Sequence, residues 1–127
     1  MKTIELSGII KYSWEDDFEK IFLVQEDGYK IDLVGRFCEI KNSFPKSSIQ
    51  VGYYLSNTSK KRDEMVEGFL KTLYGGLSAD YERNDYAYSS WTQGTDFNTY
   101  LSIGGHSLFY ELKEQEGRFV FIEINLN

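Results

Sequence analysis

Apolar and polar residues alternate along the first part of the chain, and this pattern predicts half-buried β-strands. Segment 3–12 is one such strand, and its apolar face is formed by Ile4, Leu6, Gly8, Ile10 and Tyr12. Glycine within a strand often marks a bend or a bulge, so a bend is expected at Gly8. The acidic segment 14–17 follows and is predicted to form the solvated tip of a hairpin.

Two more strand-like runs flank Asp27-Gly28, a dipeptide that favours a type I′ hairpin turn because both of its residues need positive φ. Segment 38–48 is predicted to be a connection around Pro45. Alternation then predicts a fourth strand over 49–56, and its apolar face consists of Ile49, Val51, Tyr53 and Leu55.

The C-terminal part of the chain predicts further strands. Segment 77–100 is dense in Tyr, Asn, Asp, Ser and Thr, and we expect it to contain a strand and a loop at Gly94. Another strand is predicted from Phe97 to Ile103. Segment 118–126 carries apolar residues on both faces, which is typical of a strand at or near the centre of a sheet.

The period of the apolar residues changes to that of a helix between residues 60 and 74. Its apolar face would be formed by Met65, Val66, Phe69, Leu70 and Leu73. Thr58 or Ser59 is suited to cap the start of this helix, and Gly75-Gly76 to end it.

A short helix is predicted over 107–116, with Ser107 as its N-cap and Gly117 just beyond its end. His106, the only histidine, precedes this helix, and Gly104-Gly105 forms the bend before it. No other histidine or cysteine lies near His106 in the sequence to complete a metal site or a catalytic pair. We therefore expect a structural position for His106 rather than a catalytic one.

These elements predict one β-rich α+β domain over residues 1–127. Strands that bend at glycine and end in a buried strand suggest a small, partly closed β-barrel of OB-like layout. It would contain about five to seven mostly antiparallel strands, the main amphipathic helix at about 60–74 and the short helix at about 107–116. The aromatic content of 10 Tyr, 9 Phe and 2 Trp agrees with a β-rich fold.

Charge and cysteine content exclude several classes of protein. The chain carries 20 acidic and 14 basic residues, a net charge of −6, so the phosphate backbone of nucleic acids would repel it outside a local basic patch. Cys38 is the single cysteine, which rules out an intramolecular disulfide. The N-terminal segment lacks the apolar core of a signal peptide, and no apolar run is long enough to span a bilayer. A cytoplasmic protein without a membrane partner is expected.

The sequence contains no recognisable catalytic or metal-binding motif. A glycine-rich phosphate loop, a nucleophile elbow and a dinucleotide fingerprint are all absent. Segment 80–85 begins like a calcium-binding loop, but Asp85 stands where that loop needs Gly and Trp91 where it needs Glu. We expect no catalytic residues, no metal and no cofactor, and hence a protein that is not an enzyme.

Binding is the remaining hypothesis, and five aromatic residues among polar neighbours are its candidates: Tyr81, Tyr86, Tyr88, Trp91 and Tyr100. A possible anion contact is formed by the basic run Lys60, Lys61 and Arg62. Acidic charge with exposed aromatics favours a protein-binding domain of inhibitor, immunity or regulatory type, with a basic protein as partner. The alternative is an OB-like binder of an oligosaccharide or a single-stranded nucleic acid, and a nucleic acid would require the basic run on the aromatic face.

Overall fold

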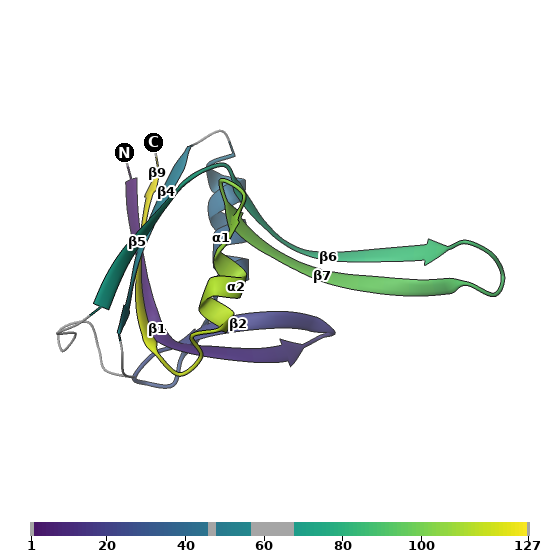
Figure 1. The fold of residues 1–127 in the computed structure, drawn as a ribbon, viewed down its shortest axis with the longest axis horizontal. Coiled ribbons are helices and arrows are strands. Elements are labelled where there is room, and N and C mark those ends of the chain that lie inside the picture. Colours follow the sequence, from purple (N-terminus) through teal and green to yellow (C-terminus); the bar gives the residue numbers. More distant parts are fainter. Residues whose placement is uncertain (1, 46–47, 57–67, 127) are drawn as a thin grey trace.

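The computed structural model describes residues 2–45, 48–56 and 68–126, and these form two antiparallel sheets and two helices (Figure 1). The larger sheet contains, in spatial order, β3 (Lys30–Asp32), β2 (Phe18–Val24), β1 (Lys2–Glu15), β9 (Phe119–Leu126), β4 (Ile49–Ser56) and β5 (Gly68–Gly75). The smaller sheet contains β6 (Leu77–Ala87), β7 (Gln93–Ile103) and β8 (His106–Ser107). The helices are α1 (Leu33–Ser43) and α2 (Leu108–Lys113), and they lie between the larger sheet and the beginning of the β6–β7 hairpin.

The predicted β-rich α+β class is confirmed, whereas a barrel is not found. The described residues form nine strands rather than the five to seven predicted, because the chain also forms the short strands β3 and β8 and the strand β5 in place of a helix. The described strands leave β3 and β5 as the two edges of the larger sheet, without pairing between them. β9 lies between β1 and β4, and Val120, Ile122 and Ile124 are buried in the core. This position confirms the prediction of a central strand near the C-terminus. No helix in the described ranges is long and apolar enough to cross a membrane.

The first hairpin follows the sequence pattern closely. Asp16 and Asp17 connect β1 to β2 with φ of 55° and 69°, the paired positive angles of a type I′ turn. Gly8 lies where β1 passes from its pairing with β9 to its pairing with β2. A Cβ at Gly8 would lie 2.9 Å from the carbonyl oxygen of Val24, so the close approach of β1 and β2 requires glycine.

The type I′ turn predicted at Asp27-Gly28 is wrong in detail. Of these two residues only Gly28 has positive φ, and the turn extends from Gln25 to Tyr29. The Gln25 N–H donates to the Tyr29 carbonyl at 2.8 Å, and the Gly28 N–H donates to the Gln25 carbonyl at 3.0 Å. The longer turn still joins two antiparallel strands, β2 and β3.

Residues 33–43 form helix α1, although the alternation predicted the end of a strand and a connection there. The Asp32 side chain caps this helix by accepting a hydrogen bond from the Gly35 N–H at 3.0 Å. The buried residues recur at helical spacing: Leu33, Val34, Phe37 and Ile40. Aspartate before a helical apolar period was therefore the sequence feature that marked this helix.

The main helix predicted at about 60–74 is wrong from residue 68 onward, and the part before residue 68 lies outside the described residues. Residues Gly68–Gly75 form strand β5, which pairs antiparallel with β4 along its whole length. Pairing with β4 satisfies backbone groups that would otherwise remain unpaired at that edge, and such tertiary pairing overrides a weak helical preference.

The short helix predicted at about 107–116 is confirmed, with α2 ending earlier, at Lys113. The Ser107 hydroxyl accepts a hydrogen bond from the Tyr110 N–H at 3.2 Å, as expected for the N-cap. Leu108 and Leu112 are fully buried beneath the helix. Gly104 and Gly105 form the predicted bend, with φ of 58° and 83°.

Gly75 and Gly76, predicted to end a helix, instead connect the two sheets. The Gly104 N–H donates to the Gly76 carbonyl at 2.9 Å. A Cβ at Gly104 would lie 2.0 Å from the carbonyl oxygen of Tyr74, and one at Gly75 would lie 2.7 Å from the Gly104 Cα. The two backbones are thus in direct contact, and this contact fixes where the β6–β7 hairpin leaves the rest of the molecule.

Candidate functional site

The β6–β7 hairpin projects from the body of the protein as a two-stranded arm, residues 77–103 (Figure 1). Its strands pair from Leu77↔Ile103 to Ala87↔Gln93, which corresponds to a length of roughly 35 Å. The connection is a loop at residues 88–92 rather than at Gly94. This loop is ordered by Ser89, whose hydroxyl accepts hydrogen bonds from the N–H groups of Trp91 and Thr92 at 3.1 and 3.2 Å.

The half of the arm nearest the body is firmly attached. Alternation places Ala79, Leu101 and Ile103 on an inner face, and all three are buried in the core. On the same face, the Tyr81 ring packs against Phe18 at a centroid distance of 5.2 Å, and its hydroxyl donates to Asp32 Oδ1 at 2.6 Å. Burial and the Asp32 carboxylate both raise the pKa of Tyr81. Tyr81 is thus placed where it anchors the arm.

Removal of the Tyr81 hydroxyl is expected to destabilise the protein. Because the lost hydrogen bond ends on a carboxylate, Tyr81→Phe should lower the free energy of unfolding by about 1.5 kcal/mol, measured by urea denaturation. Tyr29→Phe is the matched control, since Tyr29 is exposed and a surface change should stay within about 0.5 kcal/mol. Equal effects of the two substitutions would show that the bond to Asp32 does not stabilise the arm.

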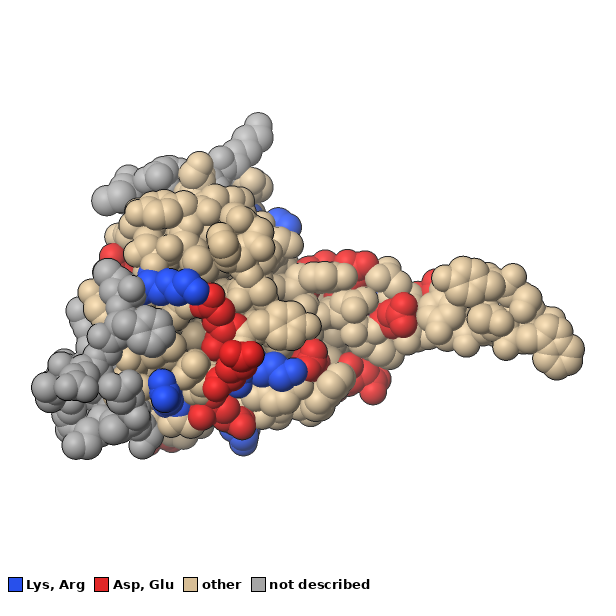
Figure 2. Space-filling view, viewed as in Figure 1, with Lys and Arg blue, Asp and Glu red and all other residues tan. Residues whose placement is uncertain are grey.

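Phe97 is the last arm residue with a ring contact to the body, at 5.3 Å from the Phe18 ring, centroid to centroid. Beyond it, the outer half of the arm makes its hydrogen bonds and ring contacts within itself. The Thr95 hydroxyl donates to Asp85 Oδ1 at 2.8 Å, and Arg83 forms an ion pair with the same oxygen at 3.3 Å. The hydrogen bond from Thr95 and the charge of Arg83 hold the pKa of Asp85 below its usual range. Towards the end of the arm, the segment between Asp85 and Asp96, residues 86–95, contains no charged side chain. Figure 2 shows acidic side chains along the shaft of the arm and none at its end.

Exposed aromatic rings gather near the end of the arm. Trp91 is 92% exposed in the loop, and Tyr88 is 82% exposed beside it. The Tyr86 ring lies 5.5 Å from the Tyr88 ring, centroid to centroid. Tyr86 also covers Gly94 on the opposite strand, because a Cβ at Gly94 would lie 2.4 Å from the Tyr86 hydroxyl. These residues form the aromatic tip of the arm, defined as Tyr86, Tyr88 and Trp91.

The five predicted aromatic residues are therefore not all brought together. Three of them form the aromatic tip. Tyr100 lies nearer the body and is 42% exposed, on the side of the arm opposite the inner face, which we call the outer face. Tyr81 lies on the inner face and packs against the core. The basic run Lys60, Lys61 and Arg62 lies outside the described residues. Sequence analysis did not select Trp14, which is 64% exposed near the end of the β1–β2 hairpin. Its position beside an acidic turn was the feature of the sequence that could have identified it as exposed.

The other titratable clusters are engaged in structural contacts. Lys113 Nζ donates to Glu19 Oε1 at 2.8 Å, and the Tyr12 hydroxyl donates to the same oxygen, which ties α2 to the β1–β2 hairpin. Hydrogen bonds from Lys113 and Tyr12 lower the pKa of Glu19. The Cys38 thiol contacts the Ala79 carbonyl at 3.2 Å, and burial raises its pKa, which disfavours a reactive thiolate.

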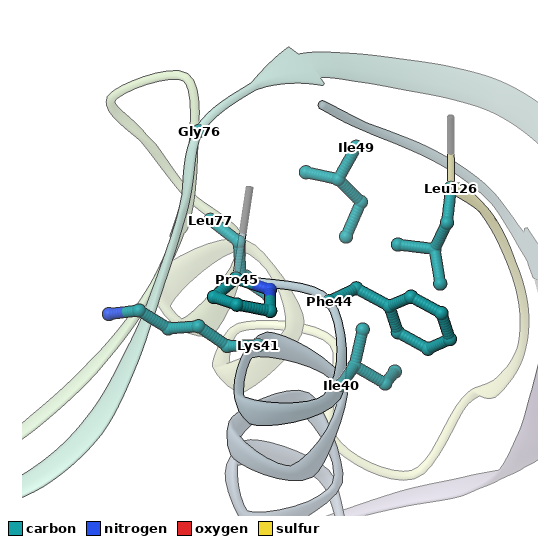
Figure 3. A pocket seen from close by; sticks show the side chains of 8 residues that line it. All are labelled: Ile40, Lys41, Phe44, Pro45, Ile49, Gly76, Leu77 and Leu126. Atoms are coloured by element: carbon teal, nitrogen blue, oxygen red, sulfur yellow. The ribbon is translucent and has the colours of Figure 1, made fainter. Parts of the chain in front are cut away.

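A small pocket of about 140 Å³ lies at the C-terminal end of α1 (Figure 3). The side chains that line it are apolar apart from that of Lys41, and the lining residues are Ile40, Lys41, Phe44, Pro45, Ile49, Gly76, Leu77 and Leu126. The Lys41 ammonium points away from the apolar side chains in this view. The pocket therefore presents no pair of groups for acid–base or nucleophilic chemistry.

His106 begins β8, pairs with Ile103 and is exposed at the surface. Within the described ranges, no three His, Cys, Asp or Glu side chains converge in a way that could hold a metal ion. Comparison of the chain with protein-family models, with curated proteins and with solved structures gives no match. Among the residues that the structure describes, the candidate site is defined by the arm and its aromatic tip.

Proposed function

We propose that this protein is a non-enzymatic binding domain of inhibitor, immunity or regulatory type, and that the arm is its binding element. The observation that carries the proposal is the aromatic tip: Tyr88 and Trp91 are more than four-fifths exposed on a projecting, uncharged segment. Tyrosine and tryptophan dominate the energetics of protein interfaces because they offer large, rigid contact areas with a polar edge.

The construction of the tip favours binding further. Tyr86 is held by its contact with Tyr88 and by its position across Gly94, and Ser89 fixes the backbone of the loop. Groups that are already ordered lose less conformational entropy when a complex forms. The tip is thus suited to insert into a preformed depression on a partner.

The charge of the arm supports a basic partner. It carries four carboxylates, Asp80, Glu82, Asp85 and Asp96, against the single basic residue Arg83. The whole chain has a net charge of −6. Complementary charge accelerates encounter and makes binding sensitive to salt. A basic rim around an apolar depression is the partner surface that fits both the shaft and the tip.

The proposal is tested by capturing partners on the immobilised protein from a lysate of its own organism. We expect one stoichiometric basic protein that is released as the salt concentration rises and that fails to bind the double variant Tyr88→Ser/Trp91→Ser. Trp14→Ser is the matched control, because Trp14 is exposed on a different hairpin. Equal retention by the double variant and the wild type would show that the arm is not the binding element.

The alternative function is recognition of an oligosaccharide or a single-stranded nucleic acid, with the exposed aromatic rings of the arm in place of the groove of an OB-like barrel. One observation favours the oligosaccharide: hydrogen-bonding side chains adjoin the exposed Trp91 ring in the sequence, and they are Ser90, Thr92 and Gln93. Binding of the wild type to a glycan panel, lost in the double variant and unchanged by salt, would support this alternative over a protein partner.

A further inference from the structure

We infer that the outer face of the arm imitates a single strand of nucleic acid, and that the arm enters a partner's cleft that otherwise holds such a strand. This inference rests on the proposed function and names the kind of site on the basic partner. The observation that carries it is the outer face of the arm, an unpartnered sheet face that bears both negative charges and aromatic rings.

The register of the arm places three carboxylates in successive rows of the outer face. Asp80 lies opposite Tyr100, Glu82 lies opposite Asn98, and Asp96 lies opposite Asn84. Adjacent rows on one face are about 6.8 Å apart, twice the rise of an antiparallel strand. A stacked nucleic-acid strand carries one charge per about 3.4 Å of its axis. Measured along the arm axis, the rows of carboxylates on the two strands therefore match the spacing of every second phosphate.

These three carboxylates are available to an external cation. Among the described residues, none of them forms an ion pair, whereas Asp85 on the inner face is paired with Arg83. Glu82 accepts a hydrogen bond from the Asn84 side chain, which orients it along the arm without neutralising it. Asp80 and Asp96 are exposed.

Aromatic rings flank this row of charges at both ends. Tyr100 lies beside Asp80 at the end nearest the body, and Tyr86 follows the row of Asp96 at the other end. Both rings are exposed, and the Tyr86–Tyr88 pair extends the series to the tip. The outer face therefore presents charges and flat rings on one side of the arm, distributed over both of its strands. An unpaired nucleic-acid strand likewise offers phosphates and bases to one cleft.

The combination of groups selects this partner site over other basic surfaces. Clefts that bind single strands combine a cationic groove with aromatic platforms on which bases stack. Such a cleft would satisfy both the carboxylates and the tyrosine rings. A surface rich only in lysine would leave the rings without contacts, and a purely apolar pocket would strip water from the carboxylates at high cost.

The test uses the captured protein and two soluble competitors, a 20-nucleotide oligo(dT) and polyglutamate of equal total charge. We expect the oligonucleotide to release the captured protein from the full chain at a concentration at least ten-fold lower than polyglutamate does. The variant Asp80→Asn/Glu82→Gln/Asp96→Asn should weaken retention at least ten-fold. Its matched control removes three exposed carboxylates outside the arm, Glu5→Gln/Asp17→Asn/Glu114→Gln, and should leave retention within two-fold of wild type.

The outcomes separate this inference from the proposed function. If retention requires the aromatic tip but the oligonucleotide is no better than polyglutamate, the imitation of nucleic acid is wrong and the protein-binding function stands. Equal losses in the two triple variants would likewise overturn the inference, because net charge alone would then explain binding. If no protein is retained through the arm, both the inference and the proposed function fail.

Discussion

Gly104→Ala is expected to lower the free energy of unfolding by about 3 kcal/mol or more, the largest loss of stability that we predict for a single methyl group. Gly104 has φ of 58°, which an alanine adopts only with strain. The added Cβ would also lie 2.0 Å from the Tyr74 carbonyl oxygen, a backbone atom that cannot move aside alone. Urea denaturation followed by circular dichroism gives the measurement.

Gly105→Ala is the matched control for this prediction. Gly105 occupies the next position of the same turn with φ of 83°, but a Cβ there meets no atom within 4 Å. The Gly105→Ala variant should therefore lower the free energy of unfolding only through the unfavourable backbone conformation of alanine, by about 1 kcal/mol. A difference between the two variants of less than about 1 kcal/mol would show that the backbone contact between Gly104 and Tyr74 does not determine the stability of the junction.

Much of the fold was predictable where the local pattern and the tertiary environment agree. Strand β4 has Ile49, Val51, Tyr53 and Leu55 buried on one face, as its alternation predicts. β9 is central because it is apolar on both faces. Helix α2 begins at its expected cap, Ser107. In each case the side chains and the backbone favour the same structure.

The prediction failed where two periods fit the same residues. Leu33, Val34, Phe37 and Ile40 suit a helix, but the strand pattern that precedes them obscured its start at Asp32. In β5 the reverse occurred, since Leu73 fits a helical face and also a buried strand position opposite Val51. The choice depends on the free edge of β4, which lies far away in the sequence, so the local pattern could not decide it.

The candidate site was predictable in residue type and only partly in position. Alternation already separates Tyr81 from Tyr86 and Tyr88, because odd and even positions of one strand face opposite sides. It could not show that the odd side meets the core near Tyr81, or that the outer half of the arm extends past the body. That division follows from the junction at Gly75 and Gly104, which sets the direction of the arm.

Trp91→Ala is expected to weaken binding to the captured partner about 30-fold or more, which corresponds to about 2 kcal/mol. The ring is 92% exposed in the free protein, so its removal should leave the free energy of unfolding within about 0.5 kcal/mol of wild type. Isothermal titration calorimetry measures the affinity, and urea denaturation measures the stability. A loss of affinity without a loss of stability would assign the ring to the interface.

Trp14→Ala serves as the control for the same chemical change at another exposed position. Trp14 is 64% exposed on the β1–β2 hairpin, away from the aromatic tip, and its removal should change affinity less than two-fold. Most of the effect of Trp91→Ala should appear as faster dissociation, because the acidic shaft that governs encounter is unchanged. Similar losses for both tryptophans, or a slower association rate alone, would contradict a partner that holds Trp91 in a desolvated pocket.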